Sequence, residues 1–474
     1  MRTPFFPAFR PRLAALGRRV QHLRQQSLCH LELLLHPFLP PGLLSQADEG
    51  PNSRDRAYNL RRTFFGFLYQ VLNPSCPCRE IVRQIQALFA LHDHDRLDES
   101  TSAYCQARKR LPLDRLTRLR VAVAAAGDKM AELWHDLRPK LIEGTTVSMP
   151  DTQKNQRAYP QSGSQKPGCG FPLMKLVGLF SLSTGVLLDY AKGNKHQSEL
   201  RLLKGLLDQF KRGDLAVADR GFCSYVLLAL LLRRAVHALF RLHQFAALRS
   251  AQRSTPGQKR PALHLAQAKS KTRWLPHYCW KKIPRELTVR VIRFTLHCRG
   301  YRSESVTLVT TLLDPQKYPA QEIAKLYARR WKIELWFRDI KTSMGMEVLR
   351  CKSPQMVHKE LEMFFTAYNL IRCLLLQAGA INDVALDRMS FKGTIDSVRQ
   401  FSLAIAQARS KNKQKQLLAE LLDVMARDQV PHRPGRREPR ALKRRPKPYD
   451  RLNQPRHLMK EIPHRNTYRK NSLS

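Results

Sequence analysis

Four residues in one predicted helix have the types and the spacing that suit phosphodiester chemistry. Arg330, Glu334 and Lys341 follow Tyr327 at offsets of three, seven and fourteen residues. In an α-helix these offsets fall within a stripe roughly 60° wide and about 21 Å long, which Arg338 extends. One carboxylate therefore stands among cations, so that it could hold a metal ion while the cations hold phosphate oxygens. The alternative is an exposed helix face with intrahelical Glu–Arg pairs.

A second carboxylate is predicted at the end of a buried strand. Asp219 follows the apolar run 215–218 and precedes Arg220-Gly221, a tight turn that would make it face a cleft. The alternative is a helix N-cap, a position that Asp also favours. Two-metal phosphoryl transfer needs carboxylates that converge on cations about 4 Å apart. Asp219 and Glu334 would supply them from two rigid elements, a strand end and a helix.

The predicted helix that carries Glu334 also has an apolar side. It begins near Pro319, because proline is favoured in the first helical turn, and it stops at Gly345. The side opposite the charged stripe is expected to bury against a sheet. Its members are Leu326, Ile333, Trp336 and Ile340.

The sheet itself is predicted from the segment 136–243, where strand and helix patterns alternate. Apolar runs at 175–183 and 186–191 are joined around Thr184-Gly185, which indicates a hairpin. The whole predicted order is strands 140–148, 175–183 and 186–191, helix 198–210, strand 215–218, helix 222–234 and strand 237–242. Three strands, helix, strand, helix, strand is the order of a ribonuclease-H-like sheet, which periodicity permits without fixing it.

The remaining segments differ in composition. Residues 1–135 are predicted to be mostly helical, with a basic helix within 100–112 that could enter a DNA groove or present a solvated face. Residues 244–313 are predicted to be a mainly β insertion, and 355–378 a second helical stretch inside a core that spans 136–378. A helical region, 379–432, follows. The tail 433–474 holds 14 Lys and Arg against 3 acids, which is typical of an extended arm.

Charge identifies the class of partner. The chain has 474 residues, with 83 Lys and Arg against 38 Asp and Glu, a formal charge of +45. A charge of this size calls for a polyanion, and nucleic acid gains affinity as each neutralised phosphate releases counterions. Apolar residues make up 43% of the chain, which excludes wholesale disorder. No uninterrupted apolar run approaches 18 residues, so no membrane-spanning helix and no membrane partner is expected.

Further residues have two readings each. His92 and His94, in His-Asp-His-Asp, could bind metal, but histidines two residues apart do not share a helix face, which favours a solvated turn. Trp274 and Trp280 could stack on an extruded base or fill the core of the insertion. The ten cysteines form no paired zinc knuckles, and a reducing cytosol is the simplest setting.

Taken together, these motifs resemble one family. The pattern Tyr327-x2-Arg330-x3-Glu334-x6-Lys341 matches the signature of the insertion-sequence-four family of DDE transposases without a change in spacing. The segment 219–222 is similar to that family's second acidic motif, and 143–152 is similar to its first. The resemblance covers about 75–450 and is most specific in the helix.

The resemblance implies a fold, a cofactor and a reaction. The fold would be α/β: a ribonuclease-H-like core with a β insertion, a helical N-terminal DNA-binding domain and a basic C-terminal tail. Two Mg²⁺ ions held by Glu143, Asp219 and Glu334 would support cleavage at the element's terminal inverted repeats and joining of the 3′-hydroxyl ends to target DNA. Tyr327, Arg330 and Lys341, with Arg338 beside them, would bind DNA phosphates. A homodimer and a bacterial cytoplasmic, nucleoid-associated location are also implied.

One departure from the family bears on activity. The first acidic motif normally opens with Asp, and here Glu143 stands there. The extra methylene moves the carboxylate about 1 Å, and misplacement of that size can cost on the order of 100-fold in rate. Three outcomes stay open: the site tolerates Glu143, Asp151 replaces it, or this copy is an inactive, DNA-binding protein. A metal-dependent nuclease without strand transfer is a further alternative.

Overall fold

The structure is a computed structural model of the chain. It describes residues 31–40, 42–45, 56–74, 76–91, 96–242, 262–266, 272, 274–275, 277–296, 304–408, 410–431, 454–455 and 458–459. The predictions for the His-Asp-His-Asp segment at 92–95 and for nearly all of the tail 433–474 lie outside the described residues.

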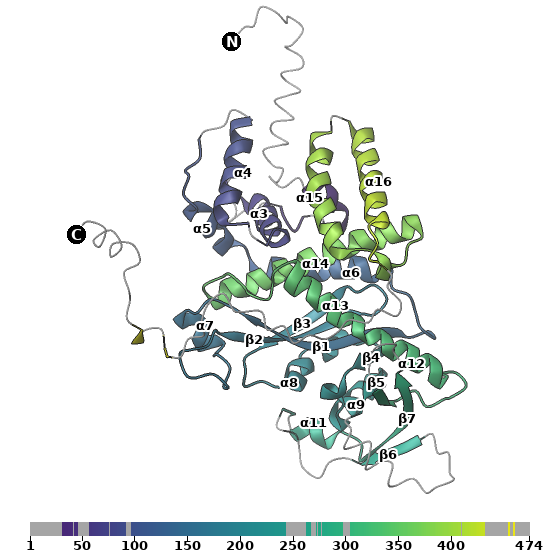
Figure 1. The fold of residues 1–474 in the computed structure, drawn as a ribbon. Coiled ribbons are helices and arrows are strands. Elements are labelled where there is room, and N and C mark those ends of the chain that lie inside the picture. The colour runs from purple at the N-terminus through teal and green to yellow at the C-terminus, as the bar shows by residue number, and fades with distance from the viewer. Residues whose placement is uncertain are drawn as a thin grey trace, which may run out of the picture.

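An eight-stranded mixed sheet runs through the centre of the protein, with helices on both faces (Figure 1). The strand order is β3-β2-β1-β4-β5-β8-β7-β6. Strands β1, β4 and β5 are parallel to one another, whereas β2 and β3 on one side, and β8, β7 and β6 on the other, pair antiparallel with their neighbours. The strands are β1 Arg138–Ser148, β2 Leu173–Ser181, β3 Leu187–Gly193, β4 Asp214–Ala218, β5 His237–Arg241, β6 Ala262–Ala266, β7 Glu286–Leu296 and β8 Glu304–Thr310.

The predicted order of elements in 136–243 is confirmed, with boundaries within three residues for the strands. The hairpin turns at Gly185, whose φ of +70° is accessible to glycine at little cost. The predicted helix 198–210 is instead two pieces, α8 Glu199–Lys204 and the short 3₁₀ turn η2 Leu207–Gln209, separated at Gly205. In the segment 244–313, which is predicted to be mainly β, the structure contains β7 and β8. The strand β8 joins the main sheet beside β5.

The central strands are apolar on both sides because both faces of the sheet are covered. Along β1, Leu141 faces a core cluster formed with the helices after residue 319, and Ile142 faces a cluster formed with α8 and α9 Tyr225–Leu232. Figure 1 shows these two helical layers above and below the sheet. Because successive side chains of a strand point to opposite faces, neighbouring residues of β1 face opposite helical layers.

The predicted helix between Pro319 and Gly345 is present but not uniform. It consists of α12 Ala320–Ala328, the 3₁₀ turn η4 Arg329–Trp331, α13 Lys332–Arg338 and the π-helical turn η5 Asp339–Ser343. Pro319 precedes the first turn, and Gly345 follows the last with a φ of +82°. The apolar side is buried as predicted: Leu326, Ile333, Trp336 and Ile340 are at most 6% exposed. Short 3₁₀ and π turns inside a helix often occur at functional sites.

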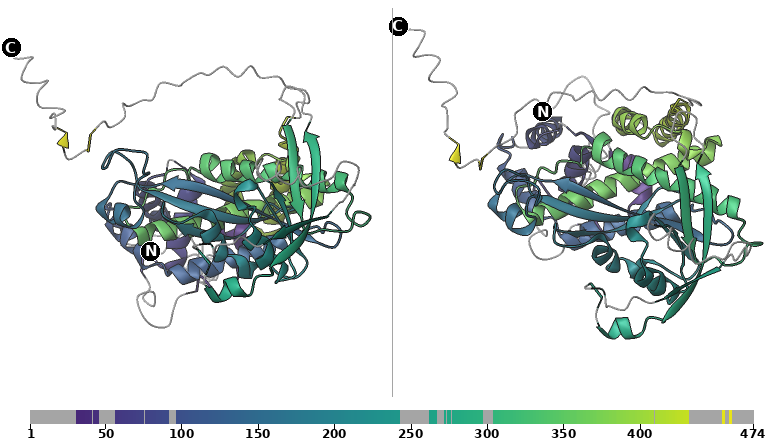
Figure 2. Two further views of the ribbon diagram at one scale, coloured as in Figure 1. Left: turned by 90° about the horizontal axis from the view of Figure 1, so that it is seen from below. Right: turned by 60° about the horizontal axis from the view of Figure 1, so that its bottom comes forward.

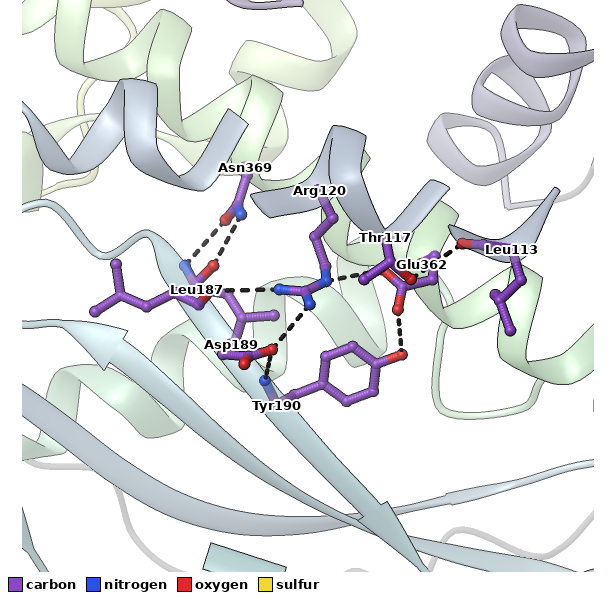
Figure 3. A network of polar contacts seen from close by, with 9 residues as sticks. Leu113, Thr117, Arg120, Leu187, Asp189, Tyr190, Glu362 and Asn369 are labelled. Atoms are coloured by element: carbon purple, nitrogen blue, oxygen red, sulfur yellow. Dashed lines mark hydrogen bonds and ion pairs between the residues drawn. The ribbon is translucent and has the colours of Figure 1, made fainter. Parts of the chain in front are cut away.

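The longest helix, α14 Pro354–Asn382, crosses the molecule next to the sheet. By length and composition alone it could span a membrane, but 83% of its most apolar window is buried inside the protein. Polar side chains tie it to the edge strand β3. Asn369 accepts a hydrogen bond from the Leu187 amide and donates one to the Leu187 carbonyl, each 2.9 Å long, and Arg120 links the helix to Asp189, as Figure 3 shows.

Helices from both ends of the chain pack around α14. The described N-terminal elements are α2 Leu31–Leu35, η1 His36–Phe38, α3 Leu60–Leu72, α4 Cys78–Leu91, α5 Ser102–Arg110 and α6 Leu113–Asp128. The C-terminal ones are η6 Leu386–Arg388, α15 Phe391–Gln407 and α16 Lys411–Arg427. Figure 2 shows both groups gathered on the α14 side of the sheet.

The basic helix predicted within 100–112 is α5, and one of its cations points inward. The Arg108 guanidinium lies 3.8 Å from the Phe67 ring centroid and contacts the sulfur atoms of Cys78 and Cys351. The groove-reading interpretation is therefore wrong for Arg108, because an arginine used for packing between helices is not available to a base edge. Lys109, in contrast, has an exposed side chain.

Candidate active site

Two of the predicted carboxylates lie on neighbouring parallel strands, Glu143 in the middle of β1 and Asp219 directly after the end of β4. The last register pair between β1 and β4 is Ile142 with Ala218, so Glu143 and Asp219 occupy the next position on each chain. Asp219 keeps an extended backbone (φ −79°, ψ 175°), and its side chain makes no N-cap hydrogen bond. Asp219 does stand at the N-cap position of the 3₁₀ turn η3 Arg220–Phe222, where an extended backbone is usual, but its side chain does not cap that turn. Neighbouring strands are about 4.8 Å apart, and in-register residues point to the same face.

The helix residues meet these carboxylates through direct contacts. Arg330 Nη1 lies 3.1 Å from Glu143 Oε2, and its Nη2 lies 3.4 Å from Glu334 Oε1. Tyr327 donates a hydrogen bond of 3.4 Å to Asp219 Oδ1. The structure thus brings Glu143, Asp219 and Glu334 to one site, in which a single guanidinium joins the two glutamates.

Exposure differs sharply along the predicted stripe. Tyr327 is 3% exposed and Arg330 is 4% exposed, whereas the side chain of Glu334 is 47% exposed. The expectation that the charged stripe of the helix is open to solvent is therefore wrong for Tyr327 and Arg330. The strand β1 and the end of β4 cover these two side chains. The Glu334–Arg330 pair of the alternative reading does exist, but Arg330 also holds a carboxylate from a strand 187 residues away.

Burial and like charge act together on Glu143. Burial raises the pKa of this carboxyl to about 7; the Arg330 charge opposes that rise, and the charges of Asp219 and Glu334 add to it. Burial likewise raises the pKa of the Tyr327 hydroxyl, so that it remains a hydrogen-bond donor near neutral pH. The three carboxylates thus carry more negative charge than Arg330 neutralises, which makes the site attractive to cations.

The other two predicted contacts lie further along the helix. Arg338, the last residue of α13, is exposed. The Lys341 side chain, in the π-helical turn, is 23% exposed and has its Nζ 4.0 Å from Glu347 Oε1. Asp151, the alternative first acid, is exposed and accepts a 2.9 Å hydrogen bond from Gln156. Its charge is not among those that shift the pKa of Glu143.

Glu143, Asp219 and Glu334 supply the kind of ligand that a divalent metal prefers, but they are not grouped as a ready-made metal site. In the described part of the chain, no three His, Cys, Asp or Glu side chains are grouped closely enough to hold a metal as they stand. Glu143 and Glu334 are instead bound to Arg330, and Asp219 to Tyr327. The chemistry nevertheless fits Mg²⁺, which prefers carboxylate oxygen ligands and keeps several waters. A carboxyl whose pKa is raised to about 7 beside two other acids is also a site short of positive charge.

Two residues near the site escaped the sequence reasoning. Arg241, the last residue of β5, lies close enough for its charge to lower the pKa of Tyr327, against the larger effect of burial. Glu199, at the start of α8, lies over Gly144 on the opposite face of β1, where a Cβ would stand 2.1 Å from its Oε1. A cation at the end of a buried strand was the available signal for Arg241; none pointed to Glu199.

Comparisons with known proteins identify the relatives of this chain. The family model described as transposase DDE domain matches residues 134–370, which contain all three carboxylates. Transposase InsG for insertion sequence element IS4 of Escherichia coli (strain K12) is 26% identical over 443 residues, which is 90% of this chain and 95% of that protein. Putative transposase InsZ of the same strain is 29% identical over 131 residues, or 27% of this chain and 44% of that one.

Among solved structures, the chain is similar to the piggyBac transposase in a cryo-EM structure of its synaptic complex with hairpin DNA. The TM-score is 0.41 and 8% of residues are identical, over 85% of this chain and 86% of that chain.

The sequence match defines the class: the chain belongs to the DDE transposases, enzymes that cleave and join DNA. More narrowly, it is a member of the insertion-sequence-four family, as the match to InsG along nearly the whole chain shows.

Proposed function

We propose that this transposase cuts the ends of its element and joins them to target DNA at the site formed by Glu143, Asp219 and Glu334. The observation that carries the proposal is the contact of Arg330 with Glu143 of β1 and with Glu334, and of Tyr327 with Asp219 at the end of β4. The strand order 3-2-1-4-5, with two antiparallel and two parallel pairings, supports a ribonuclease-H-like core within 136–378.

Glu143, Asp219 and Glu334 are the residues that would hold two Mg²⁺ ions. When bound, such ions activate a water or a 3′-hydroxyl and stabilise the charge that develops on the scissile phosphate. The chain's own residues do the rest. Buried Arg330 and Tyr327 hold all three carboxylates in orientation, and Glu334 is the acid that solvent and DNA reach most easily.

Arg338 and Lys341 are proposed to hold phosphates of the DNA end. Both lie C-terminal to Glu334 on the same helix, and Arg338 is exposed at the last residue of α13. Arg330 and Tyr327 would contact DNA only where their present carboxylate partners leave a donor available. The Arg330 Nε makes no hydrogen bond among the described residues, but it is buried, so it could reach a phosphate only if the site rearranges.

The further layout is proposed on weaker, compositional grounds. Residues 1–135 would form a DNA-binding domain, 379–432 a helical C-terminal region and 433–474 a basic arm. A homodimer would join two element ends, in a bacterial cytoplasm where the protein associates with the nucleoid. These proposals rest on charge and on family membership.

End cleavage with labelled element-end DNA tests the assignment. Asp219→Asn and Glu334→Gln should each lower cleavage in Mg²⁺ on the order of 1,000-fold, because each removes about 4 kcal/mol of transition-state stabilisation. Asp396→Asn, which removes an exposed carboxylate from α15, is the matched control and should cleave normally. Retained cleavage in Asp219→Asn would refute the site.

Pre-cleaved ends separate the remaining alternatives. Joining of the 3′-hydroxyl ends to a target plasmid supports a transposase reaction, whereas cleavage without joining indicates a nuclease. If the unaltered protein binds the ends but neither cleaves nor joins them in Mg²⁺ or Mn²⁺, this copy is an inactive DNA-binding protein.

A further inference from the structure

A pocket lies on the face of the sheet away from the carboxylates. It has a volume of about 430 Å³ and is lined by Arg201, Lys204, Gly205 and Trp274. Three of these residues come from α8 and its C-terminal cap, and the tryptophan comes from the turn before α11 His277–Lys281. Pockets of this size are in the range that holds a small ligand.

The pocket is separate from the catalytic site. The leucines of α8, Leu202 and Leu203, belong to the core cluster on the Ile142 face of β1. The helical segment 320–343 that carries Glu334 is called the catalytic helix. Its residues Tyr327 and Ile333 belong to the cluster on the Leu141 face. Figure 1 shows α8 and α13 on opposite sides of the sheet. A ligand in this pocket would therefore not contact the carboxylates.

Both cations of the pocket lack acidic partners. Neither Arg201 nor Lys204 forms a side-chain ion pair or hydrogen bond in the described part of the chain. The two acids nearest in sequence are engaged elsewhere: Glu199 lies over Gly144, and Asp208 pairs with Arg234 at 3.1 Å. Two unneutralised cations beside one cavity attract an anion.

The tryptophan adds a second kind of contact. Trp274 is partly buried against the apolar cluster beneath the sheet, which fixes the indole, while part of it lines the pocket. In the described chain its ring makes no aromatic or cation–π contact. Gly205 adds no side chain, so a planar group can approach the backbone. Bases stack on such exposed rings regardless of sequence.

We propose that this pocket binds one nucleotide of a DNA strand, with the phosphate on Arg201 and Lys204 and the base stacked on Trp274. The proposal does not rest on the carboxylate site and goes beyond it. It gives the transposase a second DNA contact on the opposite face, suited to an unpaired strand because a paired base does not expose its face for stacking. One phosphate, with its two free oxygens, can contact both cations while the base of the same nucleotide stacks on the indole.

Photocrosslinking of the full chain tests this site without using its activity. The probe is a single-stranded DNA of about 12 nucleotides that carries 5-iodouracil, a length within the site sizes of single-strand-binding proteins. We expect a crosslink in the peptide that contains Trp274. Trp274→Ala, and Arg201→Gln with Lys204→Gln, should lower the yield at least fivefold, since stacking on one aromatic ring is worth about that much or more. Trp274→Phe should retain the crosslink.

Controls separate this site from general basicity and from the active site. Lys411→Gln with Lys413→Gln removes the same charge from exposed positions on α16 and should leave the yield unchanged. Glu334→Gln should also crosslink normally, whether or not it cleaves. Equal yields in Trp274→Ala and the unaltered chain would overturn the proposal. Competition by adenosine monophosphate as strong as by the oligonucleotide would assign the pocket to free nucleotides and overturn its assignment to DNA.

Discussion

Two clusters of the protein contain the same kinds of group in different states of completion. In the first, Arg120 of α6 binds Glu362 of α14 and Asp189 of β3, each at 2.8 Å, and Tyr190 donates to Glu362 at 3.0 Å (Figure 3). In the second, Arg330 binds Glu143 and Glu334 at 3.1 and 3.4 Å. Each has one arginine, two acids and a nearby tyrosine ring, but both acids of the first come from other segments, whereas Glu334 of the second is on the same helix as Arg330.

The two clusters differ in how far their acids are buried. Both arginine side chains are 4% exposed, but the acids of the Arg120 cluster are 5% and 17% exposed, whereas those of the Arg330 cluster are 23% and 47% exposed. Burial lowers the pKa of Arg120, yet the charges of Glu362 and Asp189 outweigh it and the pKa is raised. The Arg120 cluster is largely closed to solvent and connects α6, α14 and β3. The Arg330 cluster is open to further ligands.

Removing each arginine should separate the two clusters by stability. Arg120→Met leaves two buried acids without their cation and should lower the free energy of unfolding by about 3–5 kcal/mol. Arg330→Met should cost only about 1 kcal/mol, because Glu334 reaches solvent and Glu143 can take up a proton. Thermal and urea unfolding measure both.

A neighbour on α6 supplies the control for this experiment. Arg118 pairs with Asp114 at the surface, with side chains 61% and 68% exposed, so Arg118→Met should change stability by less than about 0.5 kcal/mol. Equal losses in Arg120→Met and Arg330→Met would show that both clusters are structural.

The pH dependence of stability should distinguish the clusters next. Glu143 has a pKa of about 7 against an ordinary value of 4.5, so the folded chain resists its ionisation. The stability that a neutral Glu143 allows is complete below pH 4.5 and is lost as the pH rises to about 7. Glu143→Gln cannot ionise. It should therefore gain about 2–3 kcal/mol over the unaltered chain between those limits and remain level above them.

Unfolding of the two proteins across that pH range, with EDTA present, measures the effect. The difference between them removes the contributions of all other groups. A difference that does not change between those limits would mean that the folded chain does not resist the ionisation of Glu143.

How far the sequence predicted these clusters depends on how local each one is. The apolar side of the catalytic helix was predictable, because Leu326, Ile333 and Ile340 recur at helical spacing within one segment. The sequence of strands and helices along 136–243 was predictable from local patterns as well, whereas the order of the strands within the sheet is not fixed by periodicity. What lies over a helix face is not local, so the burial of Tyr327 and Arg330 by β1 and β4 was missed.

The Arg120 cluster was missed entirely for the same physical reason. Arg120 and Glu362 are 242 residues apart, and no spacing rule joins them. A charged residue inside the long apolar run of α14 was the one available signal, because a buried acid requires a partner. The break of helix 198–210 at Gly205 was a boundary that periodicity does not resolve.

The first acid offers a sharper test of the open cluster. If Glu143 is a metal ligand, Glu143→Asp withdraws its carboxylate by one methylene toward the spacing usual in the family. End cleavage should then rise on the order of 10- to 100-fold, because reaction rates are that sensitive to misplacement near 1 Å. Asp151→Ala should have little effect in the same background. Loss of cleavage in Asp151→Ala, with Glu143→Asp neutral, would transfer the role to Asp151.

The smallest effect concerns the exposed end of the catalytic helix. Arg338 is exposed, whereas Arg330 is already bound to two acids, so only Arg338 is free to release counterions by neutralising a phosphate. Arg338→Gln should reduce the slope of log affinity against log salt by about 0.9, the value for one phosphate contact on duplex DNA. Arg330→Gln should alter that slope less while still reducing cleavage. Titrations of element-end DNA at several salt concentrations measure both slopes. An equal reduction in the two variants would mean that Arg330 exchanges its acids for phosphate when DNA binds, and that the open cluster rearranges on its substrate.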